Sequence, residues 1–571
     1  MCRLEENSGK VSAGKLLRIS QIKVNISEIY RNNREEFPTR EAWEQFYWKK
    51  EMFYIKKKSG KILGCSEKEI KQIHIIKRSL DARKKKEICY SYVVEVEVGA
   101  SLEKKLLDKE KKKRFSKANE VKYQYPEMGE QKLKHPPVVV GFGPAGMFCA
   151  WELAKAGYKP IVFEQGKKVE ERLKDVEAFW KNGILMPQSN VQFGEGGAGT
   201  FSDGKLNTTV KDPSGRNRKV LEIFVENGAS EEILYQQKPH IGTDVLCKIV
   251  KNMRENILKW GGEIHFQSKV TNIRLDENGN LTGVQINDEN WIHTQVAVFA
   301  IGHSARDTFE LFEKKKVHME QKPFAIGVRV EHEQSIINEN QYGELADILP
   351  AADYKLTHQA KNGRSIFSFC MCPGGFVVDA SSEKHALVVN GMSNSGRDEK
   401  NANSALVVNV VPEDFEGNSV LDGVEFQRKW EKKAYLEGKG KVPVQLFGDF
   451  KKKKTSTAYG NLKPIHKGKT EFGNLWNCLP GFVCETIAEG IEEFSKRIPG
   501  FDREDIVLSG VETRTSSPVR ITRNEKFEGN YKGFYPCGEG AGYAGGITSA
   551  AMDGLRVYEA IRQVYQPLEE N

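Results

Sequence analysis

A glycine-rich turn, Gly141-Phe142-Gly143-Pro144-Ala145-Gly146, constrains the fold of this chain more than any other feature. It follows an apolar run at 138–140 and opens a helix-like segment, and a second apolar run then ends in Glu164. In the pattern G-x-G-x-x-G, the first glycine permits a tight strand-to-helix turn, the second lets the backbone approach a pyrophosphate, and the third lets the helix pack on the strand. An acid about 20 residues further on is placed to hydrogen-bond a ribose. We therefore expect a dinucleotide to bind at Gly141, Gly143, Pro144, Ala145, Gly146 and Glu164.

The turn by itself does not separate FAD from NAD, and the C-terminal region supplies the distinction. The pattern at 533–539 predicts a short strand that ends in a turn with Glu539. A glycine-rich segment then leads into a helix-like run at 549–561. This arrangement resembles the second FAD motif of two-dinucleotide-type flavoproteins, in which the acid bonds the ribitol and the helix start faces the pyrimidine end of the flavin. A helix N-terminus stabilises the negative charge that reduced flavin carries near N1. The resemblance implies FAD contacts at Gly302, which follows the strand-like run 296–301, and at Gly538, Glu539, Gly545, Gly546 and Ile547.

The remaining patterns predict two further structural regions. Alternating segments at 17–24 and 88–98 predict strands of a small unit, which also contains helix-like segments near 41–50 and 66–72 and a charged helix-like run at 103–117. Alternating segments separated by turns between 324 and 411 predict an antiparallel sheet, and a helix follows at 424–436.

We therefore expect an α/β protein in which a Rossmann-type FAD-binding domain is interrupted by an antiparallel-sheet substrate domain. A small N-terminal α/β domain precedes them, and a ferredoxin-like arrangement is one option for it. The predicted boundaries are 1–120 for the N-terminal domain, 121–136 for a linker, 137–322 and 516–571 for the two parts of the FAD-binding domain, and 323–515 for the substrate domain.

Composition excludes several other classes. The chain is 39% hydrophobic and 29% charged, values typical of a globular protein with large buried cores. It has no run of about 18 apolar residues, which argues against a membrane span. The polar N-terminus lacks the apolar stretch of a secretory signal, so we expect a cytoplasmic location. Ten cysteines are scattered along the chain with Cys370 and Cys372 as the only close pair, and we expect no metal because a zinc site needs about four ligands.

The net charge of +9 is unevenly distributed. Residues 1–136 carry 33 Lys and Arg against 20 Asp and Glu, so the rest of the chain is mildly acidic. Such asymmetry marks either a nucleic-acid-binding surface or a solvated lysine-rich face, and we favour the second.

Several long segments resemble one family closely. They are 192–208, 238–244, 369–375 and 512–520, with 77–83 in the N-terminal unit. Together they resemble the uncharacterised bacterial FAD-dependent dehydrogenases, which are NAD(P)/FAD-dependent oxidoreductases of the two-dinucleotide-binding flavoprotein superfamily. The resemblance runs over about residues 70 to 565. It implies FAD binding and an oxidoreductase role, and it leaves the substrate open.

By analogy with related flavoproteins, the loop at 197–207 should lie against the flavin ring. Gly197 and Gly199 would let the backbone approach the ring, and Asp203, Lys205 and Asn207 would reach its polar edges. The catalytic candidates are Lys205, Asp203 and Cys537. The candidates for substrate contact are Arg514 and Arg520, with Arg523 nearby, and the pair Cys370 and Cys372. The arginines would anchor either an anionic substrate or the FAD pyrophosphate, and the cysteines would either form a strained disulfide or place one thiol at the flavin cavity. His240 and His303 are possible proton donors.

Three functions remain open at this point. We favour an FAD-dependent oxidoreductase that acts on a small organic molecule beneath the sheet. The alternative is a flavin-dependent RNA-modifying enzyme whose basic N-terminal domain binds nucleic acid, and the third is a flavin-bearing binding protein without catalysis. The sequence has a single strand, glycine turn and helix unit of dinucleotide type. NAD(P)H would therefore dock transiently as electron donor, or the electrons come from elsewhere. The sequence does not indicate an oligomeric state.

Overall fold

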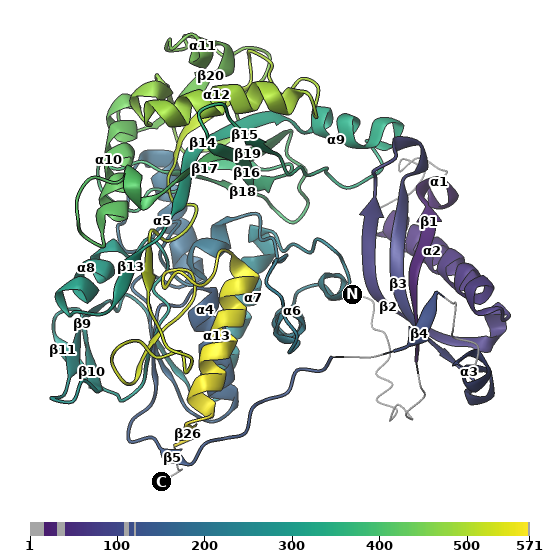
Figure 1. Cartoon of the computed structure of the whole chain (residues 1–571), viewed down its shortest axis with the longest axis horizontal. Helices are drawn as coiled ribbons and strands as arrows, with labels where there is room; N and C mark the ends of the chain where they lie inside the picture. Colours follow the sequence, from purple (N-terminus) through teal and green to yellow (C-terminus); the bar gives the residue numbers. More distant parts are fainter. Residues whose placement is uncertain (1–15, 31–39, 108–113, 119–120, 569–571) are drawn as a thin grey trace. The chain divides into compact units, whose positions relative to one another are not determined.

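The computed structural model describes residues 16–30, 40–107, 114–118 and 121–568. The chain forms two compact units (Figure 1). The N-terminal unit comprises Met1–Lys122 with the inserted segments Glu231–Pro239 and Gln341–Leu349, and the main unit comprises Tyr123–Ser230, His240–Asn340 and Pro350–Asn571.

An antiparallel sheet with strand order β2-β3-β1-β4 organises the N-terminal unit. Its strands are β1 (Leu17–Asn25), β2 (Ile70–Asp81), β3 (Cys89–Val98) and β4 (Phe115–Lys117), and its helices are α1 (Ile26–Ile29), α2 (Arg40–Leu63) and α3 (Ala100–Leu107). The chain order of strands and long helices, β-α-β-β-α-β, is that of a ferredoxin-like fold, which confirms this option for the unit.

Two helix predictions in this unit are wrong. Residues 66–72 were expected to be helical, but a short 3-10 turn at Glu67–Glu69 leads directly into β2. Exposure alternates over residues 72–76, where Ile73 and Ile75 are half-buried between exposed neighbours, and this period of two outweighs the charged character of the segment. The expected helix at 103–117 is wrong at its C-terminal end, because residues 115–117 form β4. The structure describes α3 over Ala100–Leu107, and residues 108–113 lie outside the described residues.

A parallel sheet with strand order β25-β12-β6-β7-β8 forms the Rossmann-type layer of the main unit. Its strands are β6 (Val138–Val140), β7 (Ile161–Phe163), β8 (Glu263–His265), β12 (Ala297–Phe299) and β25 (Phe534–Pro536). The helices that accompany it are α4 (Pro144–Lys155), α5 (Val169–Asn182), α6 (Arg216–Glu226), α7 (Thr243–Lys259) and α13 (Ile547–Arg562). The predicted strand, glycine turn, helix and second strand are thus confirmed at β6, α4 and β7. A small antiparallel sheet, β9 (Val270–Leu275), β10 (Leu281–Ile286) and β11 (Asn290–His293), is inserted before β12.

Helices α4 and α13 pack against each other so closely that only glycine fits at the crossing. A Cβ at Gly554 of α13 would lie 2.2 Å from the backbone oxygen of Ala145 in α4. In Figure 1, α13 runs beside α4 toward the short strand β26 (Tyr565–Gln566), which pairs with β5 (Gln131–Lys132). The segment expected as a linker, 121–136, is thus bound to the main unit at several points along its length. In addition to the β5 pairing, Tyr123 donates a hydrogen bond to Glu559 and Tyr125 donates one to Glu152.

The large mixed sheet has the strand order β15-β16-β19-β14-β23-β20-β22 and is antiparallel except for the last pair. Its strands are β14 (Phe324–Glu333), β15 (Thr357–Gln359), β16 (Ser365–Cys372), β19 (Asn401–Val410), β20 (Val442–Leu446), β22 (Thr470–Phe472) and β23 (Val507–Glu512). Helix α12 (Gly481–Ser495) lies over this sheet (Figure 1). Three further strands, β17 (Phe376–Asp379), β18 (Val389–Met392) and β21 (His466–Lys467), form a separate small sheet, and β13 (Met319–Gln321) pairs with β24 (Val519–Ile521).

The remaining helices connect these layers. They are α8 (Arg306–Lys314), α9 (Gln334–Tyr342), α10 (Asp422–Glu437) and α11 (Phe447–Lys451). The expected antiparallel sheet and the helix at 424–436 are confirmed, whereas the boundaries at 322/323 and 515/516 stay predictions.

No helix in the described ranges is long and apolar enough to cross a bilayer.

Candidate cofactor site

A cavity of about 360 Å³ in the main unit is lined by the first residues of both α4 and α13. Residues 141–145 form one end of its wall, and residues 545–547 form another part. The two helix starts on which the dinucleotide prediction depends therefore meet at a shared space.

The glycine turn has the geometry that the pattern requires. Gly141 has a φ of +92°, and a Cβ there would lie 2.5 Å from the Ala300 oxygen. A Cβ at Gly146 would lie 2.0 Å from the Gly141 oxygen, so Gly146 serves helix packing and does not line the cavity. Gly143 differs, because its nearest neighbour would be Gly197 Cα at 3.6 Å. Gly143 is also the N-cap of α4 and carries no side-chain cap, which leaves the backbone N–H groups of the first turn available to an anion.

Glu164 lines the cavity at the end of β7. Its carboxylate accepts backbone hydrogen bonds from Phe142 (2.8 Å), Gly166 (2.8 Å) and Gly194 (3.0 Å). A carboxylate has about four acceptor positions, so one position remains for a ribose hydroxyl. Glu164 thus joins the two glycine-rich segments at 141–146 and 194–199 to its own loop, as well as lining the cavity where the ribose is predicted.

The α13 end of the cavity is open where glycines face it. A Cβ at Gly302, Gly545 or Gly546 would meet no atom within 4 Å. Glu539 lines the same space, and burial raises the pKa of its carboxyl to about 7. Gly538 does not line the cavity, since a Cβ there would lie 2.6 Å from Ala145 Cβ.

The loop at 197–207 lies against the start of α13, and its predicted place beside the flavin ring stays a prediction. A Cβ at Gly199 would lie 3.1 Å from Ile547 Cγ1, and Thr548 donates a 2.7 Å hydrogen bond to the Leu206 oxygen. Lys205 is 3.2 Å from the buried Asp203 and donates to the Met371 oxygen. Asp203 also pairs with Arg397, and these neighbouring cations hold the pKa of the Asp203 carboxyl below its ordinary value despite burial.

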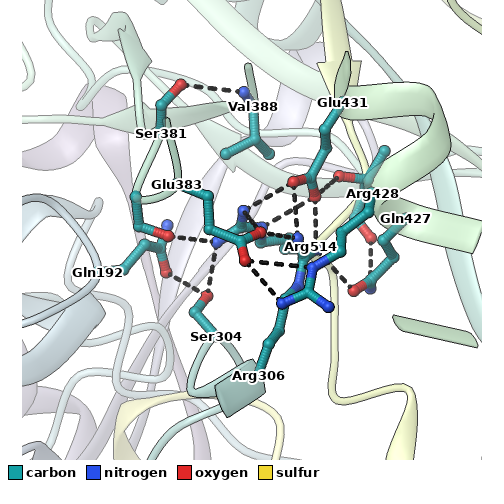
Figure 2. A network of polar contacts seen from close by, with 12 residues as sticks. Gln192, Ser304, Arg306, Ser381, Glu383, Val388, Gln427, Arg428, Glu431 and Arg514 are labelled. Carbon is teal, nitrogen blue, oxygen red and sulfur yellow. Dashed lines mark hydrogen bonds and ion pairs between the residues drawn. The ribbon is translucent and has the colours of Figure 1, made fainter. Parts of the chain in front are cut away.

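Figure 2 shows the protein groups that hold Arg514 in place. Arg514 and Arg306 both bind Glu431, at 2.7 Å each, inside a fully buried network. Arg514 also donates to Ser304 and Ser382. Although Arg514 lines the cavity, the guanidinium is engaged in joining α10 to the segments after β12 and β23.

The other predicted residues divide between the cavity and the surrounding structure. Those that line the cavity are Gly141, Gly143, Pro144, Ala145, Glu164, Gly197, Gly199, Asp203, Lys205, Gly302, His303, Cys370, Arg514, Glu539, Gly545, Gly546 and Ile547. Those that do not are Gly146, His240, Cys372, Arg520, Arg523, Cys537 and Gly538.

Three of these placements indicate roles other than those expected. Burial raises the pKa of the Cys537 thiol well above its ordinary value, so this thiol is protonated and away from the cavity. Arg523 pairs with Asp553 at 2.6 Å, and Asp553 accepts a hydrogen bond from the Gly538 backbone. Burial lowers the pKa of His303 to about 3, and the charges of Arg514 and Arg306 add to this effect, so His303 is neutral.

Arg329 is the residue that the sequence reading missed. It is 0% exposed, on β14, and it donates to Glu512 at 2.5 and 3.1 Å. It also donates to Asn390 (3.0 Å) and to the Cys370 oxygen (2.9 Å). Glu512, Asn390 and Cys370 line the end of the cavity that faces the large mixed sheet. The available signal was an arginine within the otherwise apolar run 324–330.

The structure accommodates a dinucleotide such as FAD. The turn at Gly143 offers unpaired amides, the α13 end has open space at its glycines, and both line the same cavity. A family model described as "FAD-dependent protein, C-terminal domain-like" matches residues 323–515. The chain is an FAD-dependent flavoprotein. A second model, "Domain of unknown function (DUF8436)", matches residues 44–97 of the N-terminal unit.

A bacterial relative places the chain in its family. An uncharacterised protein of Clostridium beijerinckii is 51% identical over 513 residues, which are 89% of this chain and 95% of the relative. The chain belongs to the same family as this protein. The expected membership of an uncharacterised FAD-dependent family is confirmed.

Similar solved structures include several flavoproteins at low similarity. A glycine oxidase from Bacillus cereus ATCC 14579 is 12% identical, with a TM-score of 0.30 and coverage of 75% of this chain and 95% of the other. An L-proline dehydrogenase from P. horikoshii is 14% identical, with a TM-score of 0.30 and coverage of 76% and 94%. The flavin-dependent brominase Bmp2 is 13% identical, with a TM-score of 0.34 and coverage of 75% and 79%. Scores at this level do not bear on what this chain acts on.

Proposed function

We propose that this chain is an FAD-dependent oxidoreductase that acts on a small polar molecule at the sheet-facing end of the cavity. The observation that carries the proposal is the continuity of this cavity, which runs from the α4 and α13 starts to Cys370, Asn390 and Glu512. A cofactor held at the helix starts would thus share a space with polar groups that it does not need for its own binding.

The residues of the chain would hold FAD by contacts of three kinds. The free amides at the start of α4 would bind the diphosphate, Glu164 would bind a ribose hydroxyl, and Glu539 would bind a ribitol hydroxyl. The start of α13, capped by Gly546 without a side-chain partner, would stabilise negative charge at the pyrimidine end of the ring. When bound, FAD supplies hydride or electron transfer at its N5 position.

The sheet-facing end would bind and orient the substrate. Asn207 and Asn390 offer amide donors and acceptors, and Lys205 offers an ammonium group that Asp203 fixes in position. Fixed groups of this kind favour a substrate with carbonyl or carboxylate oxygens. We propose NAD(P)H as a transient electron donor that docks at this same end.

The test is a reoxidation screen with the full chain. The protein is loaded with FAD, reduced without oxygen, and mixed with pools of small carbonyl and carboxylate metabolites while the flavin absorbance is recorded. The expected result is that a defined pool reoxidises the flavin faster than the buffer does. A protein that takes up no FAD, or a bound flavin that no pool and no NAD(P)H affects, would contradict the proposal.

A nucleic-acid partner for the N-terminal unit is the second candidate, and the surface of α2 favours it. Phe46 and Phe53 are 45% and 53% exposed, although both are large and apolar. Lys50 lies 5.9 Å from the Phe46 ring centre, and Lys57 lies 5.8 Å from that of Phe53. The two phenylalanines are seven residues apart and so share one face of the helix. Aromatic rings beside cations form the kind of platform on which single-stranded bases stack.

The second candidate predicts salt-dependent binding of a single-stranded RNA. Phosphate contacts should weaken the affinity steeply between about 50 and 200 mM salt. The double variant Phe46→Ala and Phe53→Ala should bind at least about tenfold more weakly, since each stacked base contributes roughly 1–3 kcal/mol. Leu436→Ala, at another exposed apolar residue (73%), is the control and should bind normally. Equal affinity of all three proteins, or no RNA binding at low salt, would exclude this candidate.

A further inference from the structure

The pair Cys370 and Cys372 lies at the sheet-facing end of the cavity, and the backbone bends to place it there. The register of β16 against β19 shifts between Phe369 and Cys372. Cys370, inside this irregular stretch, has a φ of +42°, which an L-residue other than glycine rarely adopts. Bulges of this kind turn side chains out of the regular strand pattern and are frequent beside active sites. Cys370 lines the cavity as a result, while Cys372 is fully buried behind it.

Two cations hold the bent segment by its backbone oxygens. Arg329 donates to the Cys370 oxygen at 2.9 Å, and Lys205 donates to the Met371 oxygen. Both cations are therefore fixed next to the thiols, and Arg329 also lies 3.9 Å from Cys372 Sγ. Cations beside a cysteine stabilise its thiolate, which is the reactive form.

The two thiols have different protonation states. The hydrogen bond from Cys372, together with the charges of Lys205 and Arg329, holds the pKa of the Cys370 thiol well below its ordinary value despite burial. Burial raises the pKa of the Cys372 thiol, and the neighbouring Cys370 raises it further. The pair thus consists of a thiolate at the cavity and a thiol behind it, and the Cys372 thiol donates a 3.3 Å hydrogen bond to the Cys370 backbone oxygen. A nucleophile paired with a nearby resolving thiol is typical of redox-active cysteines.

We propose that Cys370 and Cys372 form a dithiol/disulfide couple that exchanges two electrons with FAD. The inference rests on the proposed oxidoreductase function, which it extends by naming a redox group of the chain itself. In the oxidative direction, the Cys370 thiolate and the Cys372 thiol form an S–S bond and give up one proton and two electrons. The proton and both electrons go to oxidised FAD, which becomes its singly protonated anionic reduced form. Atoms and charge balance without any further reactant, and the reverse reaction opens the disulfide.

The couple implies that a thiol or disulfide compound can serve as the external substrate. Cys370 is the member that such a compound would reach, because Cys372 is buried behind it. With a disulfide compound, the Cys370 thiolate would attack one sulfur, form a mixed disulfide with that half and release the other half as a thiolate. The Cys372 sulfur would then attack Cys370, close the Cys370–Cys372 disulfide and release the first half as a thiol; a thiol compound would follow the reverse steps. Lys205 and Arg329 act as positioning residues for this chemistry.

The experiment follows the flavin and the thiols of the FAD-loaded full chain together, without oxygen. One sample starts as dithiol with oxidised FAD, and the other starts as disulfide with chemically reduced FAD. Each is quenched in acid and its free thiols are alkylated. Mass spectrometry of the peptide that contains Cys370 and Cys372 then shows whether the pair is dithiol or disulfide. The expected result is that, in at least one direction, one disulfide forms or opens for each FAD reduced or oxidised.

Three variants make the result specific. Cys370→Ser and Cys372→Ser should each retain FAD and abolish the exchange, because one remaining thiol cannot close the disulfide. Cys247→Ser is the control, because Cys247 is half-buried on α7 and its pKa is raised to about 11 by burial; its exchange should equal that of the wild type. If FAD binds and accepts electrons from another donor while the two thiols never change, the couple is excluded and the oxidoreductase proposal stands. A wild-type chain that takes up no FAD overturns both.

Discussion

The two ends of the cavity are built in different ways. At the helix-start end, the wall consists of two short stretches of chain, 141–145 and 545–547, in which backbone groups and open space face the cofactor. At the sheet-facing end, Lys205, Cys370, Asn390 and Glu512 come from four distant parts of the sequence. Arg329 does not line the cavity, and it donates hydrogen bonds to Cys370, Asn390 and Glu512.

This difference indicates that the helix-start end serves cofactor binding, whereas the sheet-facing end contributes to the stability of the fold. The helix-start end depends on backbone conformations that are local and that only glycine allows, as at Gly141. The sheet-facing end depends on a buried cation whose loss would leave a carboxylate without its partner. Substitutions at the first end should therefore remove the cofactor with little effect on the fold, and substitutions at the second should destabilise the fold.

The largest effect is expected at Gly143. Replacing Gly143 by valine puts a branched side chain where the diphosphate would rest, while the φ of −78° at this position strains no side chain. We expect FAD affinity to fall by at least about a thousandfold with the fold intact. Flavin absorbance after purification and a titration with FAD measure the effect. Gly481→Val is the matched control: a Cβ at Gly481 meets no atom within 4 Å, a Cβ at Gly143 meets none nearer than 3.6 Å, and Gly481 lies outside the cavity wall. If the Gly143→Val protein retains bound flavin as the control does, the diphosphate does not bind at this turn.

The next largest effect is expected at Arg329. Arg329→Leu leaves Glu512 buried without its ion-pair partner, and we expect a loss of about 3–5 kcal/mol in the free energy of unfolding. Urea unfolding of the FAD-free chain measures it. The double variant Arg329→Leu and Glu512→Leu should recover most of the loss, because an apolar pair of similar volume can replace a buried ion pair.

The control for Arg329 is an exposed ion pair in the main unit. Arg218 and Glu222 form an i,i+4 pair that is about half exposed, so Arg218→Leu should change stability by at most about 0.5 kcal/mol. Equal losses for Arg329→Leu and Arg218→Leu would mean that the buried pair does not stabilise the sheet-facing end.

The same contrast explains what the sequence predicted. The turn at 141–146, its flanking strands and the helix at 424–436 follow from patterns within about 15 residues, and all are present as β6, β7, α4 and α10. The helix expected at 66–72 was wrong because a capping pattern at Ser66 and Glu69 begins only a 3-10 turn before the alternation of β2 prevails. Arg329 could not be assigned to the site, since only the pairing of β14 with β23 brings it to Glu512, and only the pairing of β14 and β16 with β19 brings it to Cys370. That register is set by the whole sheet and not by any local motif.

A smaller effect is expected at Glu539. Its carboxyl lines the cavity near the α13 start, where the resemblance to the second FAD motif puts the ribitol. Glu539→Ala removes a hydrogen bond to a charged acceptor, which contributes about 1.5–3 kcal/mol, so FAD affinity should fall by roughly 10- to 100-fold. Glu539→Gln keeps an acceptor oxygen and should lose less. A titration that gives wild-type affinity for both variants would place the ribitol elsewhere.

The smallest effect is a difference in pH dependence between the wild type and Glu539→Gln without FAD. Burial raises the pKa of Glu539 from 4.5 to about 7 in the folded chain, so between these values the folded state binds more protons than the unfolded state. The wild type should therefore lose stability relative to Glu539→Gln as the pH rises through this window, by about 1 kcal/mol after solvent screening. Urea unfolding of both proteins at several pH values measures the difference, which should be constant below about pH 4 and again above about pH 8. A difference that does not change across the window would show that the carboxyl titrates normally, and the α13 end of the cavity would then be as well solvated as an exposed surface.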